Sequence, residues 1–454
     1  MRPIRLLILF FLLPVVMRGQ IITTFAGNGM AGNTGDGGPA TSAKINYPIG
    51  GVFDKYGNYY MAMGTIGNTI RKIDTAHVIT TVAGITGLGG FSGDSGLATA
   101  AKLKNPQGVT VDTNGNVFIA DATNHRIRKI DISTGIITTV AGNGVVGNSG
   151  DGGLAIAASI DNPLDVCTDR FGNLYIADAN GNRVRKVNAA GIITTFAGNG
   201  NYIYGGDNGL ADTSAIGSVR GICSDDTGNI YIASTQARLL KVNTQGIITT
   251  IAGTGTGIYS GDGGPAINAE LIPFKVAWDK FGNIYIADEN SKRIRKVNSQ
   301  GIISTVTGNG IAAYSGDGGP ADSAQVKDPS GVCVDKCGNL YIADAFDVRV
   351  RKVTYDSTCS YANPVDTATV IYKIAFCSKI EIYPSPTQSE ISITGLSDVK
   401  DIAIINAVGQ TVLRQNCSSN KATINVSGLK GGVYFIVVQD GKSGGVWSGK
   451  FVKE

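Results

Sequence analysis

The sequence predicts an all-β protein whose main part is a six-bladed β-propeller. Three observations lead to this prediction: a repeat of about 56 residues occurs six times, one period contains four short strand patterns, and the first copy opens with a lone fourth strand. The copies start at Ile21, Val78, Ile136, Ile192, Ile247 and Ile302, so the steps are 57, 58, 56, 55 and 55 residues. Periods of this length are typical of propellers and other repeat arrays.

The second copy shows the four strands of one blade. They are expected at residues 108–112 (GVTVD), 117–121 (VFIAD), 126–130 (RIRKI) and 136–140 (IITTV). Each is short, rich in β-branched or aromatic residues and bounded by turn residues. Glycine recurs in all six first hairpins, where the turn is expected to need a positive φ: Gly57, Gly115, Gly172, Gly228, Gly282 and Gly338. Four strands per period is the content of a propeller blade, whereas a β-helix repeats over about 20 residues.

The two ends of the repeat predict how the ring closes. Residues 21–27 (IITTFAG) form a fourth strand without a first, and the last copy supplies three strands at 331–335, 340–344 and 348–353 but no fourth. We therefore expect the N-terminal strand to complete the sixth blade, giving a propeller over residues 20–354. Such closure removes the free edges that would otherwise pair with other chains.

These residues resemble the NHL repeat, whose blades follow the pattern P-x-G-V-x-x-D-x-x-G-N-x-Y-I-A-D-x-x-N-x-R-I-R-K-V. Blade two has PQGVTVDTNGNVFIADATNHRIRKI at residues 106–130. The resemblance covers nearly three quarters of the chain. It implies the fold and leaves the function open, because one fold hosts many activities.

Residues 1–19 are expected to be a secretory signal peptide. Two arginines precede an apolar run at residues 6–16 (LLILFFLLPVV), which is shorter than the roughly 20 residues of a membrane span. Removal of this segment, with Arg2, Arg5 and Arg18, would leave 36 basic against 35 acidic residues. This balance gives no electrostatic reason to expect nucleic acid as a partner.

The last part of the chain predicts a second, smaller domain. The repeat stops near residue 353, a polar connector is expected over 355–379, and from 380 to 454 short alternating strands separated by Gly, Asn and Ser turns predict a small antiparallel β-sandwich. The segment resembles the C-terminal sorting domain of the type IX secretion system. The matching residues are Tyr383-Pro384-Ser385-Pro386, Gly409-Gln410, Leu429, Gly432-Val433-Tyr434 and Lys450-Phe451-Val452-Lys453, with Ser385 where the family usually has Asn.

The sorting-domain resemblance implies a route. The secretion machinery would recognise the tail and carry the protein across the outer membrane of a Gram-negative bacterium. The propeller would then act outside the cell or on its outer surface, where disulfides persist.

The chain has seven cysteines, of which Cys337 and Cys417 have no obvious partner in the sequence and the other five fall into two groups. Cys167, Cys223 and Cys333 occupy matching positions of first strands and are expected to be small core residues. Cys359 and Cys377 flank the connector and could close an 18-residue loop, which would stabilise the protein by about 3 kcal/mol in the chain-entropy model.

A Gly-Asp-x-Gly loop recurs in all six connectors between fourth and first strands. A ring of calcium sites and a set of structural turns are the two interpretations, because calcium needs about six to eight oxygens and each loop has one carboxylate. The aspartates are Asp36, Asp94, Asp151, Asp207, Asp262 and Asp317.

Acid and base residues recur five positions apart across the second hairpin. We expect them to face each other as structural ion pairs: Asp121 with Arg126, Asp178 with Arg183, Asp288 with Arg293 and Asp344 with Arg349. Blade one, with Met63 and Thr69, lacks both partners.

Enzyme activity is not favoured by the residues present. His77 and His125 are the two histidines and fall in turns expected on opposite faces, so they cannot share a metal, and no Gly-x-Ser-x-Gly elbow is evident. The amidating lyase with this fold uses several histidines. No catalytic residue or obligatory cofactor is therefore predicted, although calcium and a metal-dependent lyase or lactonase remain open.

Aromatic residues two positions before the Gly-Asp pair distinguish the connectors. Phe91, Tyr204, Tyr259 and Tyr314 stand where the other two connectors have asparagine. Such rings could stack sugars, anchor a protein partner or pack their own loops. The leading hypothesis is a secreted module that binds a protein partner or a glycan. A metal-dependent enzyme and a structural or adhesive surface protein are the alternatives.

Overall fold

The computed structural model describes residues 20–355, 381–383, 389–394, 399–406, 411–416, 421–440 and 446–453. The chain divides into two compact units, Met1–Tyr361 and Ala362–Glu454. The first contains the repeats and the second the C-terminal segment. The expected signal peptide and the Cys359–Cys377 pair lie outside the described residues.

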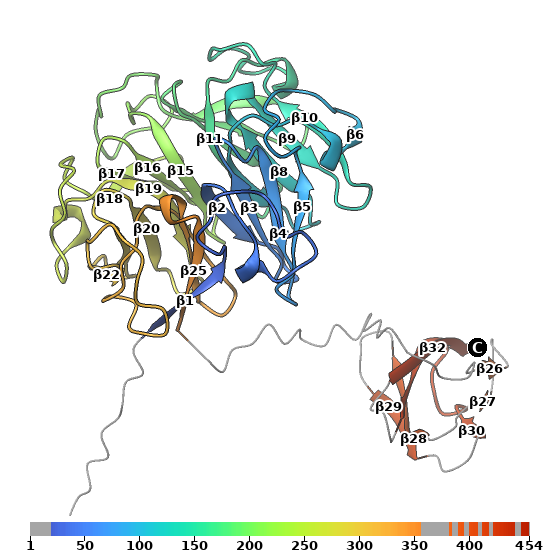
Figure 1. Cartoon of the computed structure of the whole chain (residues 1–454). Helices are drawn as coiled ribbons and strands as arrows, with labels where there is room; N and C mark the ends of the chain where they lie inside the picture. Colours follow the sequence, from blue (N-terminus) through green and yellow to red (C-terminus); the bar gives the residue numbers. More distant parts are fainter. Residues whose placement is uncertain are drawn as a thin grey trace, which may run out of the picture. The chain divides into compact units, whose positions relative to one another are not determined.

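The first unit is a six-bladed propeller of antiparallel sheets, each with four main strands and, in blade two, a short fifth strand (Figure 1). The first, innermost strands are β2 (Pro48–Phe53), β7 (Pro106–Val111), β11 (Pro163–Thr168), β15 (Val219–Ser224), β19 (Pro273–Trp278) and β23 (Pro329–Val334). The second strands are β3 (Tyr59–Met63), β8 (Val117–Asp121), β12 (Leu174–Asp178), β16 (Ile230–Ser234), β20 (Ile284–Asp288) and β24 (Leu340–Asp344). The third strands are β4 (Thr69–Ile73), β9 (Arg126–Ile130), β13 (Arg183–Val187), β17 (Arg238–Val242), β21 (Arg293–Val297) and β25 (Arg349–Thr354). The fourth strands are β5 (Ile79–Ala83), β10 (Ile136–Ala141), β14 (Ile193–Ala197), β18 (Ile248–Ala252), β22 (Ile303–Thr307) and β1 (Ile21–Ala26).

The ring closes as the sequence predicts. Strand β1 pairs antiparallel with β25, with Ile22 opposite Val353, so the N-terminal strand is the fourth strand of blade six. The side chains of Tyr59 in blade one and Tyr341 in blade six share one buried cluster, so the core is continuous across the junction.

The turn between first and second strands explains the Asp-x-x-Gly-Asn motif. In blade two, one oxygen of Asp112 accepts the backbone N–H groups of Asn114 and Asn116 at 2.9 and 2.8 Å, and the other accepts the Asn116 side chain at 2.8 Å. Gly115 has φ +92°, and the equivalent glycines of all six blades also have positive φ, which confirms the expected turn.

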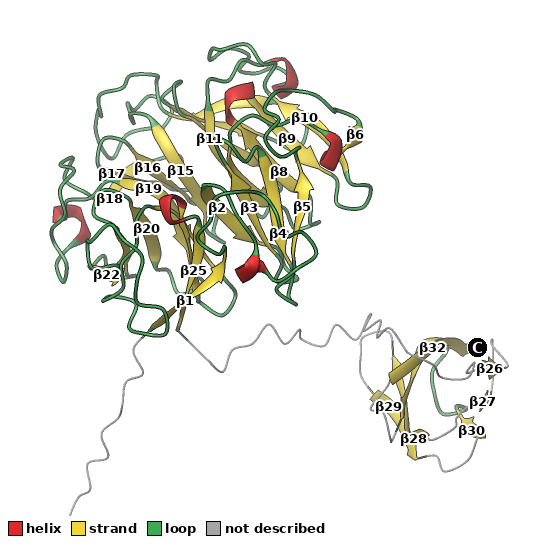
Figure 2. Cartoon of the chain, viewed as in Figure 1, coloured by secondary structure: helices red, strands yellow, loops and turns green. Residues whose placement is uncertain are grey.

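The connectors cover the outer edge of each blade. Short bridges join them to the fourth strands, as at Pro39 with Val78 and Leu154 with Ile192, and in blade two the bridge is a short strand, β6 (Gly96–Leu97), beside β10. Because an unpaired edge strand can recruit other chains, this cover keeps the rim of the propeller closed. Figure 2 shows the short 3₁₀ helices among the loops. They are η1 (Ala40–Ser42), η2 (Ala98–Ala100), η4 (Ala155–Ala157) and η5 (Ala266–Asn268) in connectors, and η3 (Ala122–Asn124) and η6 (Ala345–Asp347) after second strands.

The second unit consists of two small antiparallel sheets. One contains β26 (Glu381–Tyr383), β27 (Glu390–Thr394) and β30 (Lys421–Asn425), and the other contains β28 (Val399–Asn406), β29 (Thr411–Asn416), β31 (Gly432–Asp440) and β32 (Val446–Lys453). Ile391 and Ile424 of the first sheet share a buried cluster with Ile404 and Ile436 of the second. Two sheets with a common core form the small sandwich that the sequence predicts.

Candidate functional site

The inner strands differ at their third residue, where the repeat normally has glycine. Blades one, two, four and six have Gly50, Gly108, Gly221 and Gly331, whereas blade three has Asp165 and blade five has Lys275. Crowding explains Gly331 and Gly221: a Cβ on Gly331 would collide with the Ile49 carbonyl oxygen, and one on Gly221 would lie 2.8 Å from the Lys275 Cα. Two blades therefore place charged side chains where the others leave no side chain at all.

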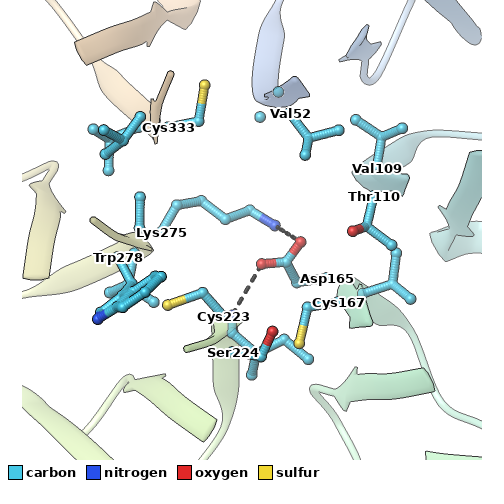
Figure 3. Close-up of a pocket in the computed structure, with 18 of the residues that line it drawn as sticks. Val52, Val109, Thr110, Asp165, Cys167, Cys223, Ser224, Lys275, Trp278 and Cys333 are labelled. Atoms are coloured by element: carbon cyan, nitrogen blue, oxygen red, sulfur yellow. Dashed lines mark hydrogen bonds and ion pairs between the residues drawn. The ribbon is translucent and has the colours of Figure 1, made fainter. Parts of the chain in front are cut away.

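Lys275 and Asp165 form an ion pair inside the channel. The Lys275 Nζ lies 2.8 Å from an Asp165 carboxylate oxygen and donates to the Leu164 carbonyl at 2.8 Å. The other Asp165 oxygen accepts the Ile222 backbone N–H at 2.9 Å. Figure 3 shows the lysine extending towards the aspartate, with the ion pair between them dashed. The pair joins blades three, four and five around the channel.

The ion pair is almost fully withdrawn from solvent. The side chains of Lys275 and Asp165 are 6% and 11% exposed. Burial lowers the pKa of Lys275, and the attraction and hydrogen bond of Asp165 oppose that shift. Taking each ion out of water costs several kcal/mol, and the glycines of four blades show that this fold does not need a charge here. The pair is therefore a candidate for function.

A cavity of about 220 Å³ adjoins this ion pair. Its lining includes the hydroxyl-bearing residues Thr110, Thr168 and Ser224, and the indole-bearing Trp278. All lining residues come from the third to sixth positions of the inner strands, so the cavity occupies the half of the channel next to the first hairpin turns. It is smaller than the roughly 300–1,000 Å³ of sites for drug-sized ligands, so it suits one small polar ligand.

Three cysteines also line this cavity. Cys167, Cys223 and Cys333 are free, Cys167 and Cys333 are buried, and Cys223 is half-buried (Figure 3). Burial raises the pKa of all three thiols, so they are protonated and unreactive at neutral pH. The predicted role as small apolar residues fits, with the addition that they form a wall of the cavity. Cys337, outside the cavity, is disulfide-bonded.

A second hollow lies beside the cavity. It has a volume of about 320 Å³ and is lined by the first hairpin turns of blades five and six, including Lys280, Phe281 and Gly338. Trp278 and Val334 line both spaces. The hollow therefore adjoins the cavity on the face of the propeller that carries the first hairpin turns.

The connector aspartates bind neighbouring side chains. Five of the six contact a buried arginine of a third strand at 2.5–2.7 Å: Asp36 with Arg71, Asp94 with Arg128, Asp151 with Arg185, Asp262 with Arg295 and Asp317 with Arg351. Asp207 instead accepts Tyr204 and Thr250. Each of these carboxylates thus accepts a hydrogen bond from a guanidinium or a hydroxyl group of the protein, which is what the structural interpretation expects. Calcium at these aspartates stays a prediction.

The ion pairs across the second hairpin differ from the prediction. Asp121 lies opposite Arg126 in register, and the same holds for Asp178 with Arg183, Asp288 with Arg293 and Asp344 with Arg349. The salt bridges of the first three aspartates, however, go to the arginine two residues further along: Asp121 with Arg128, Asp178 with Arg185 and Asp288 with Arg295, at 3.4–3.6 Å. Asp344 accepts the backbone N–H groups of Lys327 and Asp328.

The arginines predicted as partners have another role. Arg126 donates to the Asn124 and Asn143 carbonyl oxygens, both at 2.8 Å, and so ties the turn of its own blade to the following connector. Arg183, Arg293 and Arg349 make equivalent contacts with backbone carbonyls. The prediction named the wrong arginine. Strand register determines which residues lie opposite each other along the backbone, but the side chain buried beside the aspartate is that of the arginine two positions further along the third strand.

The aromatic residues of the connectors pack on arginines. The guanidinium of Arg126 lies 3.8 Å from the ring centre of Phe91, as do those of Arg293 and Arg349 from Tyr259 and Tyr314. Arg238 lies 4.6 Å from the Tyr204 ring. The three tyrosine hydroxyls bond Asp207, Asp262 and Asp317 at 2.6–2.9 Å. These contacts give each ring a role in its own loop, and ligand binding by Phe91, Tyr204, Tyr259 and Tyr314 stays a prediction.

Comparisons with known proteins place both parts of the chain. Residues 381–454 match the family of the secretion system C-terminal sorting domain, and residues 89–149 match the Teneurin NHL domain. Human Teneurin-1 is 32% identical over 232 residues, which is 45% of this chain and 8% of the relative. NHL repeat-containing protein 2 of Gallus gallus is 27% identical over 296 residues, 56% of this chain and 40% of the relative.

The chain carries an NHL-type six-bladed propeller and a type IX secretion sorting domain. It spans less than half the length of these curated relatives. Among solved structures, an auxiliary nutrient binding protein from Bacteroides thetaiotaomicron shares the fold with a TM-score of 0.55 at 17% identity, covering 74% of this chain and 76% of that one.

The sorting domain indicates that the NHL propeller is secreted to the outer surface or the medium, and implies contact with the secretion machinery. Within the described residues, no helix has the length and apolar character of a membrane span. Nor does the described part contain a group of three or more His, Cys, Asp or Glu side chains arranged to hold a metal ion.

Sequence reasoning missed Asp165 and Lys275, although a signal was present. The NHL pattern P-x-G-V becomes PLDV in blade three and PFKV in blade five. Neither substitution would draw attention by itself. Their pairing required knowledge that the third positions of blades three and five approach each other inside the ring.

Proposed function

We propose that this secreted NHL propeller is a glycan-binding module that holds a sugar in the channel cavity. Lys275 offers a donor and Asp165 an acceptor, while Thr110, Thr168 and Ser224 add hydroxyls along the wall. Trp278 offers an aromatic surface to a sugar ring. The observation that carries the proposal is the buried Lys275–Asp165 pair, because it replaces two glycines of the repeat and forms the polar part of a cavity.

The size and lining of the cavity favour a sugar over a protein partner. A specific protein interface usually buries about 800 Å² per partner, whereas this cavity admits one small ligand. Its mixture of paired charges, hydroxyls and one indole suits a polar ring that has an apolar face. The description of the Bacteroides thetaiotaomicron propeller as a nutrient binding protein supports a binding role for this fold, and a similarly described propeller from Bacteroides ovatus has a TM-score of 0.53 at 16% identity.

The proposed function also requires a route by which the propeller reaches the cell surface. Residues 1–19 would direct the chain to the periplasm, and the tail over 380–454 would take it across the outer membrane. The propeller over 20–354 would then meet glycans outside the cell.

A glycan array probed with the purified secreted protein tests this function. The protein should bind a restricted set of glycans, and Trp278→Ala should weaken binding at least tenfold, because the aromatic surface is lost. Tyr202→Ala is the matched control, since Tyr202 is an exposed aromatic residue of a connector, outside the cavity. Binding that survives Trp278→Ala, or an array without any bound glycan, would contradict the proposal.

The same array separates the channel from the connector loops. Binding should be equal in calcium and in chelator, because the cavity offers paired side chains of the protein itself. Loss of binding in chelator would contradict the channel site and favour calcium at the connector aspartates.

A further inference from the structure

Exposed aromatic rings recur on the hairpin-turn face in alternate blades. The second residue after the aspartate of each Asp-x-x-Gly-Asn turn is Tyr56, Phe171 and Phe281 in blades one, three and five, and Asn114, Thr227 and Cys337 in blades two, four and six. Phe171 and Phe281 are 63% and 65% exposed. Since Asn114 and Thr227 form the same turn, the turn itself does not require an aromatic residue.

Phe281 differs from the other two rings in its surroundings. It lines the hollow of about 320 Å³ that shares Trp278 and Val334 with the channel cavity. At the end of the inner strand, blade three has Thr168 and blade one has Phe53 where blade five has Trp278. Only blade five therefore combines an exposed ring in the turn with an indole at the mouth of the cavity.

Lys280 adds a polar contact to this hollow. Its ammonium group lies 5.3 Å from the Phe281 ring centre, and both residues line the hollow. An aromatic surface beside an ammonium donor suits a sugar, which has an apolar ring face and hydroxyls at its rim. The hollow itself presents the exposed ring of Phe281 among polar turn residues, which is a smaller contact than a protein partner would need.

We propose that the hollow formed by Trp278, Lys280, Phe281 and Val334 is a second sugar subsite, so that the ligand is an oligosaccharide that extends from the channel over the turns of blades five and six. This inference rests on the proposed function of the channel. It adds that the first sugar lies in the cavity and the next packs on Phe281.

Affinity as a function of chain length tests the second subsite. Titration calorimetry on the secreted protein would use malto-, cello-, laminari- and manno-oligosaccharides of one to four units. At least one series should bind about tenfold more tightly with two units than with one, and Phe281→Ala should abolish that gain while leaving affinity for the single sugar unchanged.

Phe171→Ala is the matched control. The ring has the same turn position and a similar exposure, but it lies in a blade with Thr168 in place of Trp278. The control should leave every affinity unchanged. An equal loss in both variants would overturn the assignment of the subsite to blade five.

Different results would contradict the channel site and the second subsite. Binding of single sugars without a gain from longer chains contradicts the second subsite and leaves the channel site intact. Absence of binding to every series contradicts both.

Discussion

At the level of single residues, the third position of the inner strands holds two kinds of residue. The close approach of the strands requires glycine at some of these positions, but it does not require the charged residues at the others. The inner strands approach so closely that a Cβ at Gly331 meets backbone. Asp165 and Lys275 fit because each lies beside a glycine of the preceding blade, Gly108 and Gly221. Their placement thus depends on residues that carry no side chain.

The Lys275–Asp165 pair should show the asymmetry of a buried ion pair. Lys275→Ala should lower the free energy of unfolding by about 3–5 kcal/mol, because it leaves the Asp165 carboxylate buried without its partner. The double change Asp165→Gly with Lys275→Gly removes both charges and should cost far less. Chemical denaturation of the three proteins measures this difference. A double variant as unstable as the single one would contradict the account.

The corrected pairing of Asp121 can be tested by double-mutant cycles. Asp121→Asn with Arg128→Met should show a coupling free energy above about 1 kcal/mol, because the two buried groups contact each other at 3.4 Å. Asp121→Asn with Arg126→Met should show less than about 0.5 kcal/mol, since Arg126 bonds backbone carbonyls. The reverse order of couplings would restore the pairing expected from register.

At the level of strands and turns, buried carboxylates end the second strands. Burial raises the pKa of Asp178 to about 7 and those of Asp121 and Asp344 to about 6, against opposing hydrogen bonds and arginines. In the unfolded chain an aspartate has a pKa of about 3.9. The folded state therefore binds more protons than the unfolded state between about pH 4 and 7.

Stability should fall as the pH rises through that window. The protonated carboxyl groups contribute to the free energy of unfolding in full below about pH 4. That contribution is lost as the pH rises through their folded pKa values, because the buried site disfavours the ionised form. Thermal unfolding at pH 5.5 and pH 8 should show a higher midpoint at pH 5.5. Asp178→Asn should reduce the difference, and a midpoint that rises from pH 5.5 to 8 would contradict the raised pKa values.

Strands and turns show most clearly which features of the fold the local sequence predicts. Period, strand pattern and the lone fourth strand at the N-terminus were enough to predict six blades and their closure, because each depends on local sequence. The salt bridges were mispredicted because blade one, with Met63 and Thr69, suggested the wrong arginine. Blade four lacks both members of the observed pair, with Ser234 and Leu240 in their places. Partners across the channel could not be predicted, because their contact joins different blades.

At the level of the whole molecule, the two units have separate tasks. The sorting domain indicates export, and the NHL propeller is the part proposed to bind. Five of the six blades anchor their connector through an aspartate and a buried arginine, so the rim is nearly uniform. The departures that matter for function gather instead in the channel and at the turns of blade five.

Removal of residues 380–454 should change location without changing the propeller. The shortened chain should accumulate in the periplasm, because the segment that matches the sorting domain is absent. Cell fractionation with surface labelling measures this outcome, and the full chain is the control. Surface display of the shortened chain would show that another segment directs export.

The central claim is that the charged pair in the channel serves ligand binding, since the scaffold does not require it. The most direct measurement is the affinity of the Asp165→Gly, Lys275→Gly double variant for the tightest-binding oligosaccharide, determined by calorimetry beside the unchanged protein. We predict a loss of at least a hundredfold with a thermal midpoint close to that of the unchanged protein. An affinity that survives the double change would contradict the claim.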